Sequence, residues 1–284
     1  MIQVENLIYN YPDSEKPALK NIDFEVKEGE VFGFLGPSGA GKSTTQKVLN
    51  GILKNYKGKV IVNGHEVSKI HRSFYEQIGV AFEFPNLYSR LTALENLKLF
   101  ASFYKTETED SENLLEMVGL LADKNTRVEA FSKGMKMRLN FVRALINKPK
   151  LLFLDEPTSG LDPVNARQMK DIIIDMKNKG VTIFLTTHNM ADADELCDRL
   201  AFMVNGQLPV INETKALKLQ HGKKLVRVNY KDKGNIISND FELTKLSENE
   251  AFQHVLKHNE IETIHTLEAS LEDIFIKITG QKLS

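Results

Sequence analysis

Eight consecutive residues constrain the fold of this chain more than any other part of it: Gly36, Pro37, Ser38, Gly39, Ala40, Gly41, Lys42 and Ser43. They match the pattern G-x-x-x-x-G-K-[ST], whose expected context is a strand followed by a loop that opens a helix. The continuous apolar run at 31–35 and the helical pattern at 42–53 supply that context. The motif therefore predicts a buried strand, a glycine-rich loop and a helix in direct succession.

Two more short apolar runs, at 151–154 and 181–185, have the same character. The segment between them opens with Asp162-Pro163, which is a capping residue followed by proline at the first helical position. Strands that are apolar throughout and alternate with helices are what a parallel sheet covered on both faces requires. We therefore predict an α/β fold with the parallel-sheet core of a P-loop NTPase.

Three segments depart from this alternation. Residues 1–30 and 58–68 read as short strands with turns, which predicts an antiparallel β flap. Residues 86–148 are mainly helical and read as an insertion in the core. After about residue 220 the composition becomes polar and rich in lysine. We expect one domain at 1–220 and a small α+β domain at 221–284, ending in a helix that Ser270 caps and Gly280 stops.

Composition narrows the functional classes. The 284 residues carry a net charge of −1, so no broad basic field invites nucleic acid. The one cysteine, Cys197, cannot form an internal disulfide, and this fits a cytoplasmic protein. We see no secretory signal and no run of the ~18 apolar residues that span a bilayer. A role at a membrane would therefore depend on a partner.

The eight-residue motif has the chemistry of a phosphate-binding loop. Its glycines let backbone N–H groups surround phosphate oxygens, and the helix N-terminus adds partial positive charge. Lys42 would reach the β- and γ-phosphates of ATP, and the Ser43 hydroxyl would bind Mg²⁺. Thr44 extends the nucleotide-binding stretch. A glycine-rich turn with a stray lysine is the alternative reading.

The strand at 151–154 ends in two carboxylates, Asp155 and Glu156. The carboxyl ends of parallel strands are where such sheets place their ligand chemistry. We expect Asp155 to hold Mg²⁺ and Glu156 to act as the general base on the attacking water. By itself the pattern also fits a helix cap, and the phosphate-binding loop upstream is what favours catalysis.

Further motifs carry a resemblance to the ATP-binding cassette (ABC) proteins. The segment Phe131–Met135 resembles the ABC signature LSGGQ, and Ser159–Asp162 resembles the D-loop. Thr187-His188 resembles the H-loop, and Tyr11 stands where the family stacks an aromatic ring on adenine. These motifs occur in the family's order across residues 1 to about 220. Tyr9 is the alternative to Tyr11.

The resemblance implies a dimer that binds two ATP molecules at its seam. Ser132 and Gly134 would cap the γ-phosphate of ATP bound by the opposite subunit. His188 would contact the γ-phosphate and align the water with Glu156. The partners implied are a second nucleotide-binding subunit, with a homodimer favoured, and an integral-membrane permease. The protein itself is then expected in the cytoplasm, peripheral on the inner face of the cell membrane. The segment 84–97 is the expected docking surface.

Two positions depart from the family pattern. Glu83 stands where the Q-loop glutamine is expected, and we expect it still to bind Mg²⁺. Lys133 stands at the first glycine of the signature, where it either adds charge near phosphate or points into solvent.

The end of the chain bears on the direction of transport. Residues 271–280 resemble the ending of ABC-2-type exporter ATPases, so we expect an exporter subunit. An ABC importer ATPase would share every catalytic motif and is the first alternative. A soluble ABC protein acting on DNA or ribosomes is the second, and a P-loop kinase is the third. The transported substrate is not readable from this chain.

Overall fold

The computed structural model describes residues 1–281 except 13, 223, 233 and 268. The chain divides into two compact units, Met1–Glu213 and a unit that begins at Thr214. The change in composition noted after about residue 220 lies close to this division. The assignment of the first part as the nucleotide-binding domain and of the second as an accessory domain stays a prediction.

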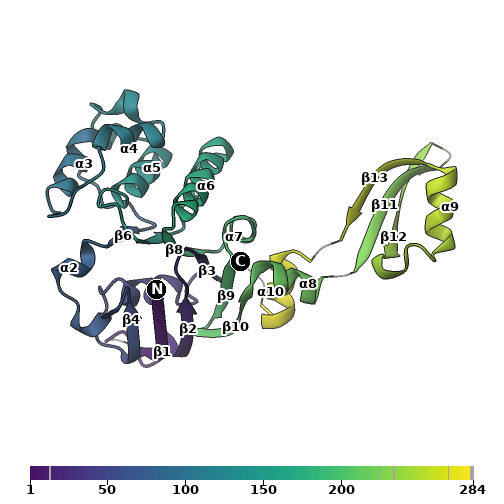
Figure 1. Cartoon of the computed structure of the whole chain (residues 1–284), viewed down its shortest axis with the longest axis horizontal. Helices are drawn as coiled ribbons and strands as arrows, with labels where there is room; N and C mark the ends of the chain where they lie inside the picture. The colour runs from purple at the N-terminus through teal and green to yellow at the C-terminus, as the bar shows by residue number, and fades with distance from the viewer. Residues whose placement is uncertain (13, 223, 233, 268, 282–284) are drawn as a thin grey trace. The chain divides into compact units, whose positions relative to one another are not determined.

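A six-stranded sheet forms the centre of the first unit (Figure 1). Its strand order is β10-β9-β3-β8-β7-β6, and all neighbours are parallel except β10 and β9. The strand order differs from the order along the chain. Parallel neighbours cannot be joined by a tight turn, so longer connections that contain helices link them. The strands are β3 (Val31–Leu35), β6 (Ile78–Ala81), β7 (Leu151–Asp155), β8 (Thr182–Thr187), β9 (Arg199–Val204) and β10 (Gln207–Glu213).

The predicted antiparallel flap is present as a second sheet. Its order is β2-β1-β4-β5, with bounds Leu19–Val26, Ile2–Tyr9, Lys57–Val62 and His65–Glu66. Asn63 and Gly64 form the turn between β4 and β5, both with positive φ, as an Asn-Gly hairpin requires. Phenylalanine rings join the flap to the parallel sheet, because Phe24 of β2 contacts Phe34 of β3 with ring centroids 5.0 Å apart. The core of this unit therefore lies between the two sheets.

Helices cover the parallel sheet and form the expected insertion. In Figure 1, α3, α4 and α5 are grouped together on the β6 side of the sheet. The helices of the first unit are α1 (Lys42–Leu49), α2 (Arg72–Tyr75), α3 (Ala93–Ala101), α4 (Ser111–Met117), α5 (Lys133–Arg143), α6 (Pro163–Asn178) and α7 (Met190–Leu196). Among the described residues, no helix is both long enough and apolar enough to cross a membrane.

Local signals set the ends of several helices. The Thr92 hydroxyl accepts from Glu95 N, and the Glu95 carboxylate accepts from Thr92 N, so α3 begins with a capping box. Asp162 caps α6, and Pro163 follows at the first helical position. Helix α1 is shorter than the predicted 42–53, because it ends at Leu49 and Gly51 takes a positive φ of 76°.

The second unit has its own sheet and core. Strands β12, β11 and β13 form an antiparallel sheet in that order, and Val226, Val228 and Tyr230 of β11 are buried. Ser270 caps α10, and Gly280 ends it with φ 68°, as predicted. The elements are α8 (Thr214–His221), β11 (Leu225–Asp232), β12 (Asn235–Glu242), α9 (Glu250–His258), β13 (Glu260–Thr266) and α10 (Leu271–Thr279).

Candidate active site

The carboxyl ends of four neighbouring parallel strands gather the site in the first unit. The glycine-rich loop follows β3, Asp155 ends β7, and Thr187 ends β8. Glu83 follows β6 at the next position in the sheet. Because parallel strands end at the same edge, residues far apart in the chain meet there.

The glycine-rich loop has a backbone that only glycines permit at some positions. Gly39 and Gly41 take φ of 77° and 115°. A side chain at Gly36 would collide with the carbonyl oxygen of Met203 on β9. Helix α1 then begins at Lys42 without a side-chain cap and without an acidic residue in its first turn. This helix terminus is suited to an anion, since its N–H groups and dipole face the loop.

Lys42 lies inside the loop. Its ammonium donates to Gly36 O at 2.7 Å and to Pro37 O at 3.1 Å, and the residue is buried. Burial lowers the pKa of Lys42, and the nearby carboxylates of Glu156, Asp155 and Glu83 offset part of that effect. The loop therefore holds a desolvated cation in a position suited to phosphate oxygens.

Asp155 is the acidic residue nearest the start of α1. The Ser43 hydroxyl donates to Asp155 Oδ1 at 3.3 Å, and the Thr186 hydroxyl of β8 donates to the same oxygen. Asp155 is buried with 7% exposure. A hydroxyl and a carboxylate in contact supply the hard oxygen ligands that Mg²⁺ prefers.

Glu156 is held in an unusual backbone conformation with its carboxylate fixed. Its φ is +50°, in the left-handed region that costs a non-glycine residue about 1–3 kcal/mol. One carboxylate oxygen lies 2.8 Å from His188 Nδ1, and the other accepts from the Thr187 hydroxyl at 3.0 Å. The glutamate is buried, whereas the His188 side chain is 58% exposed. The pair has the geometry of an oriented base with a polar neighbour that faces outward.

Glu83 joins the site through a loop that α5 holds. The negative charge of Glu83, with those of Glu156 and Asp155, raises the pKa of Lys42 against the larger effect of burial. The Asn140 side chain donates to Phe82 O at 2.8 Å, and the Arg143 guanidinium donates to Val80 O and Asn86 O. The third carboxylate of the site therefore sits on a segment that the helical insertion controls.

Tyr11 is the more accessible of the two candidate aromatics. It is 38% exposed and its hydroxyl lies 3.1 Å from the Thr44 hydroxyl of α1. Tyr9 is buried and contacts the edge of Tyr11, with ring centroids 5.1 Å apart. Tyr9 thus packs against Tyr11, and Tyr11 is the ring that can contact a ligand beside the loop.

The signature segment is not part of this cluster. Ser132 caps α5, and its hydroxyl accepts from Met135 N at 3.2 Å. A side-chain carbon added at Gly134 would lie 3.5 Å from Leu161, and one at Gly160 would lie 2.9 Å from Lys133 Cε. Among the described residues, no side-chain hydrogen bond joins Ser132 to the glycine-rich loop. Lys133 lies over Gly160, so the signature packs beside the D-loop of its own chain.

Residues that sequence reasoning missed stand behind the site. Thr186 of β8 orients Asp155, and Gln46 of α1 lies beside Thr186. The signal for Gln46 was a polar residue on the buried face of α1, four positions after Lys42.

A histidine pair, the exposed aromatics of 84–97 and the cysteine are further residues that could carry chemistry or contacts. His254 and His258 of α9 stack with ring centroids 4.4 Å apart, but the described residues contain no group of three metal-binding side chains. Of the expected docking residues, Phe84 is 75% and Tyr88 50% exposed. Cys197 is buried, and that burial raises the pKa of its thiol.

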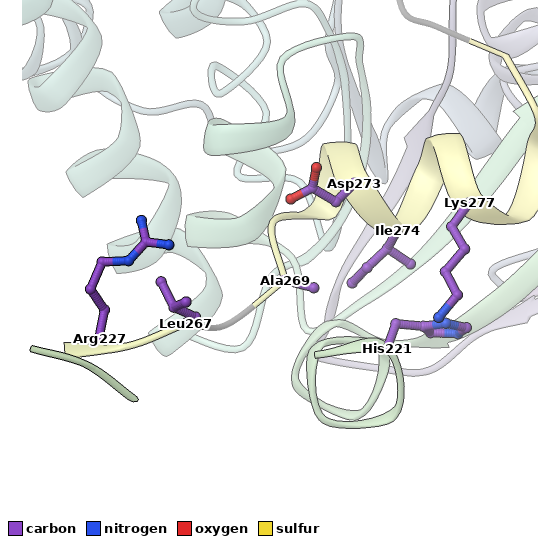
Figure 2. A pocket seen from close by; sticks show the side chains of 7 residues that line it. All are labelled: His221, Arg227, Leu267, Ala269, Asp273, Ile274 and Lys277. Atoms are coloured by element: carbon purple, nitrogen blue, oxygen red, sulfur yellow. The ribbon is translucent and has the colours of Figure 1, made fainter. Parts of the chain in front are cut away.

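The second unit contains a cavity of its own, of about 550 Å³. Figure 2 shows the side chains that line it, which are apolar and charged residues together: His221, Arg227, Leu267, Ala269, Asp273, Ile274 and Lys277. Arg227 is already paired with Asp240, with Nε and Oδ1 2.7 Å apart. All seven residues follow Thr214, so none belongs to the site described above.

Comparison with known protein families gives two matches. Residues 19–159 match the model described as "ABC transporter". Residues 224–268 match the model described as "Fluoroquinolone efflux ABC transporter C-terminal domain".

Curated proteins and solved structures agree with these matches. The chain is 51% identical to a fluoroquinolones export ATP-binding protein of Mycobacterium tuberculosis, over 100% of this chain and 95% of that protein. It is 35% identical to the Nod factor export ATP-binding protein I of Neorhizobium galegae, over 99% and 85% of the two chains. A dimeric ATP-binding cassette in a post-hydrolysis state, bound to ADP and Pi, is similar in structure. That likeness has a TM-score of 0.69 and 26% identity, over 75% of this chain and 99% of the other.

Proposed function

This chain belongs to the family of ABC transporter ATP-binding proteins, and on that premise we propose that it is the ATP-hydrolysing subunit of a drug exporter. It would bind ATP and Mg²⁺ in the first unit, close as a dimer around two nucleotides, and drive a separate membrane permease. The observation that carries the proposal is the arrangement of Glu156 with His188 and Thr187 beside Lys42.

Glu156 is the proposed general base. Its two oxygens are fixed by His188 Nδ1 at 2.8 Å and by the Thr187 hydroxyl at 3.0 Å. A base held in this way can orient and polarise a water molecule for attack on the γ-phosphate, a role that contributes about 10²–10⁴-fold to rate. His188 is exposed on its outer side, where it can meet the γ-phosphate.

Lys42 and the glycine-rich loop are the proposed phosphate-binding groups. The loop from Gly36 to Ser43 would surround the phosphates with N–H groups, and Lys42 would exchange its backbone oxygens for the β- and γ-phosphates. Ser43, Asp155 and Glu83 would hold Mg²⁺, which neutralises charge on the phosphates when it is bound. Tyr11, which borders Thr44, would stack on the adenine.

The proposed assembly is a dimer with a membrane partner. Ser132 and Gly134 are separate from the glycine-rich loop of their own chain, which supports their action on ATP bound by a second copy. The exposed Phe84 and Tyr88 are suited to a groove-type contact with a permease helix. That contact would hold the protein at the inner face of the cell membrane.

Export of fluoroquinolone-like drugs is the proposed task. The support is 51% identity, over all of this chain and 95% of the relative, to a fluoroquinolones export ATP-binding protein of M. tuberculosis, together with the match of the C-terminal domain model. Both lines of support concern relatives, so the substrate rests on similarity.

The decisive experiment is Glu156→Gln, with Glu129→Gln as the matched control. Glu129 is exposed and pairs with Arg127 at 3.8 Å, outside the site. We expect E156Q to lower ATP hydrolysis at least 100-fold while ATP binding persists, and to abolish drug resistance in cells that also carry the permease. E129Q should behave as wild type. Hydrolysis by E156Q near the wild-type rate would overturn the assignment.

A further inference from the structure

Gln46 is a buried polar residue that the proposed mechanism does not use. It lies on α1, one turn after Lys42, and is 1% exposed. Its side-chain nitrogen has no hydrogen-bond partner among the described residues. A buried unpaired N–H group costs about 1–3 kcal/mol, so its presence calls for a physical explanation.

The neighbour that matters is Thr186 of β8. Its hydroxyl oxygen lies within reach of three acceptors, namely Asp155 Oδ1, Gln46 Oε1 at 3.4 Å and Leu154 O at 3.4 Å. A hydroxyl has one hydrogen and two lone pairs. The contact with Asp155 is the shortest of the three, so that hydrogen goes to Asp155 and none remains for Gln46.

A rotation of the last side-chain torsion of Gln46 by 180° removes both the unpaired N–H group and the need for a second hydrogen on the Thr186 hydroxyl. It exchanges the amide oxygen and nitrogen, so that the N–H group donates to a lone pair of Thr186 Oγ1. The nitrogen then has a hydrogen-bond partner, and the amide oxygen is left without one. A buried carbonyl oxygen without a partner is less rare in proteins than a buried N–H group without one. The result is a chain of hydrogen bonds in one direction, from Gln46 through Thr186 to Asp155.

We propose that Gln46 is a positioning residue for the metal ligand Asp155, acting through Thr186. This inference rests on the proposed function, in which Asp155 and Ser43 bind Mg²⁺. Hydrogen bonds in a chain polarise one another, and the chain fixes Asp155 Oδ1 where the Ser43 hydroxyl also meets it at 3.3 Å. Groups that orient a metal ligand typically change metal affinity 10–100-fold when they are lost.

The test measures how strongly Mg²⁺ and nucleotide support each other's binding. A fluorescent, non-hydrolysable ATP analogue is titrated in EDTA and in excess Mg²⁺, and the ratio of the two dissociation constants reports the coupling. We expect Gln46→Met, which keeps the shape and removes the donor, to reduce that ratio about tenfold or more. Affinity in EDTA should stay within about twofold of wild type.

Three variants complete the design. Asn50→Leu removes another buried amide, at the residue that follows α1, whose nitrogen is also unpaired, and it should leave the ratio unchanged. Thr186→Val should match Gln46→Met, and Thr186→Ser should keep the wild-type ratio. The double variant Q46M/T186V should lose no more than T186V alone, because both act through one chain.

The outcomes separate the inference from the proposed function. Asp155→Asn should abolish most of the Mg²⁺ dependence, and if it does not, the metal site and this inference both fail. If D155N acts as expected while Q46M keeps the wild-type ratio, only the role of Gln46 is overturned. If Q46M does not fold, the comparison of T186V with T186S decides the question. Equal ratios of the two dissociation constants in those variants would overturn the inference.

Discussion

Lys42 carries a positive charge that its buried surroundings disfavour. Burial disfavours its ammonium more than the carboxylates of Glu156, Asp155 and Glu83 favour it, so its pKa in the folded protein is lowered. The unfolded chain holds this proton more tightly, so the charge opposes folding at neutral pH. That cost is relieved as the pH rises through the folded pKa toward the ordinary value for lysine.

Lys42→Met should therefore change the stability of the nucleotide-free protein little, because relief of the buried charge offsets the loss of the hydrogen bonds to Gly36 O and Pro37 O. ATP should no longer raise its Tm, whereas saturation at 100 times Kd stabilises a binding-competent protein by about 2.7 kcal/mol. Differential scanning fluorimetry with and without ATP measures both effects. Lys47→Met on the same helix is the control and should keep the ATP response. A clear loss of Tm in K42M without nucleotide would contradict this account.

Glu83 adds a charge where the family pattern has a neutral amide. We expect Glu83→Gln to raise the Mg²⁺ concentration needed for half-maximal ATPase activity several-fold, since a neutral oxygen attracts the cation less. ATP binding in EDTA should tighten, because one negative charge near the phosphates is gone. Glu116→Gln, on exposed α4, serves as the control. An unchanged Mg²⁺ dependence in E83Q would show that Glu83 is not a metal ligand.

Helix α5 is the element that connects two parts of the proposed machinery. Ser132 caps its N-terminus within the signature, and Arg143 in its last turn holds the loop that carries Glu83. The Arg143 guanidinium also lies 5.0 Å from the ring centroid of Phe100, and burial lowers its pKa. A rigid helix with these contacts links the position of the signature to that of the Glu83 loop.

Arg143→Met should lower the free energy of unfolding by about 2 kcal/mol, because two backbone carbonyls lose a charged donor. Arg167→Met is the informative comparison. Arg167 makes two ion pairs on the surface, with Asp171 and Glu195, and such pairs contribute only about 0–1 kcal/mol. Urea unfolding measures both variants. Equal losses would mean that Arg143 contributes no more than a surface residue.

One chain by itself supplies only part of each proposed catalytic site. The glycine-rich loop, Glu156 and His188 meet at one edge of the sheet, while the signature faces elsewhere beside the D-loop. In the proposed dimer, head-to-tail pairing of two copies would bring each loop to the other copy's signature. Closure of that pair is the motion that a membrane partner would receive.

Cysteine crosslinking tests this pairing, and the buried Cys197 will not interfere. The variant S38C/K133C places one exposed cysteine in the loop and one at the signature. In the E156Q background we expect an ATP-dependent disulfide-linked dimer on a denaturing gel. The control S38C/K59C moves the second cysteine to an exposed position of the flap. Equal crosslinking of the two pairs would exclude the head-to-tail seam.

Local chemistry made much of both units predictable from the chain. The strand–loop–helix around Lys42, the caps at Thr92, Asp162 and Ser270, and the Asn63-Gly64 turn depend on neighbours within about four residues. The resemblance to ABC proteins, which the comparisons confirmed, rested on the same short motifs. Such signals survive in the sequence because backbone conformation and capping involve few residues.

Contacts between distant segments required the folded chain. Glu156 and His188, and likewise Asp155 and Thr186, meet because β7 pairs with β8. Gln46 reaches Thr186 because α1 lies against that same edge. No spacing in the chain reports these meetings, since they follow from strand order and from how helices pack on the sheet. The sequence motifs thus indicated the chemistry, whereas tertiary packing determined which side chains orient the proposed reacting groups.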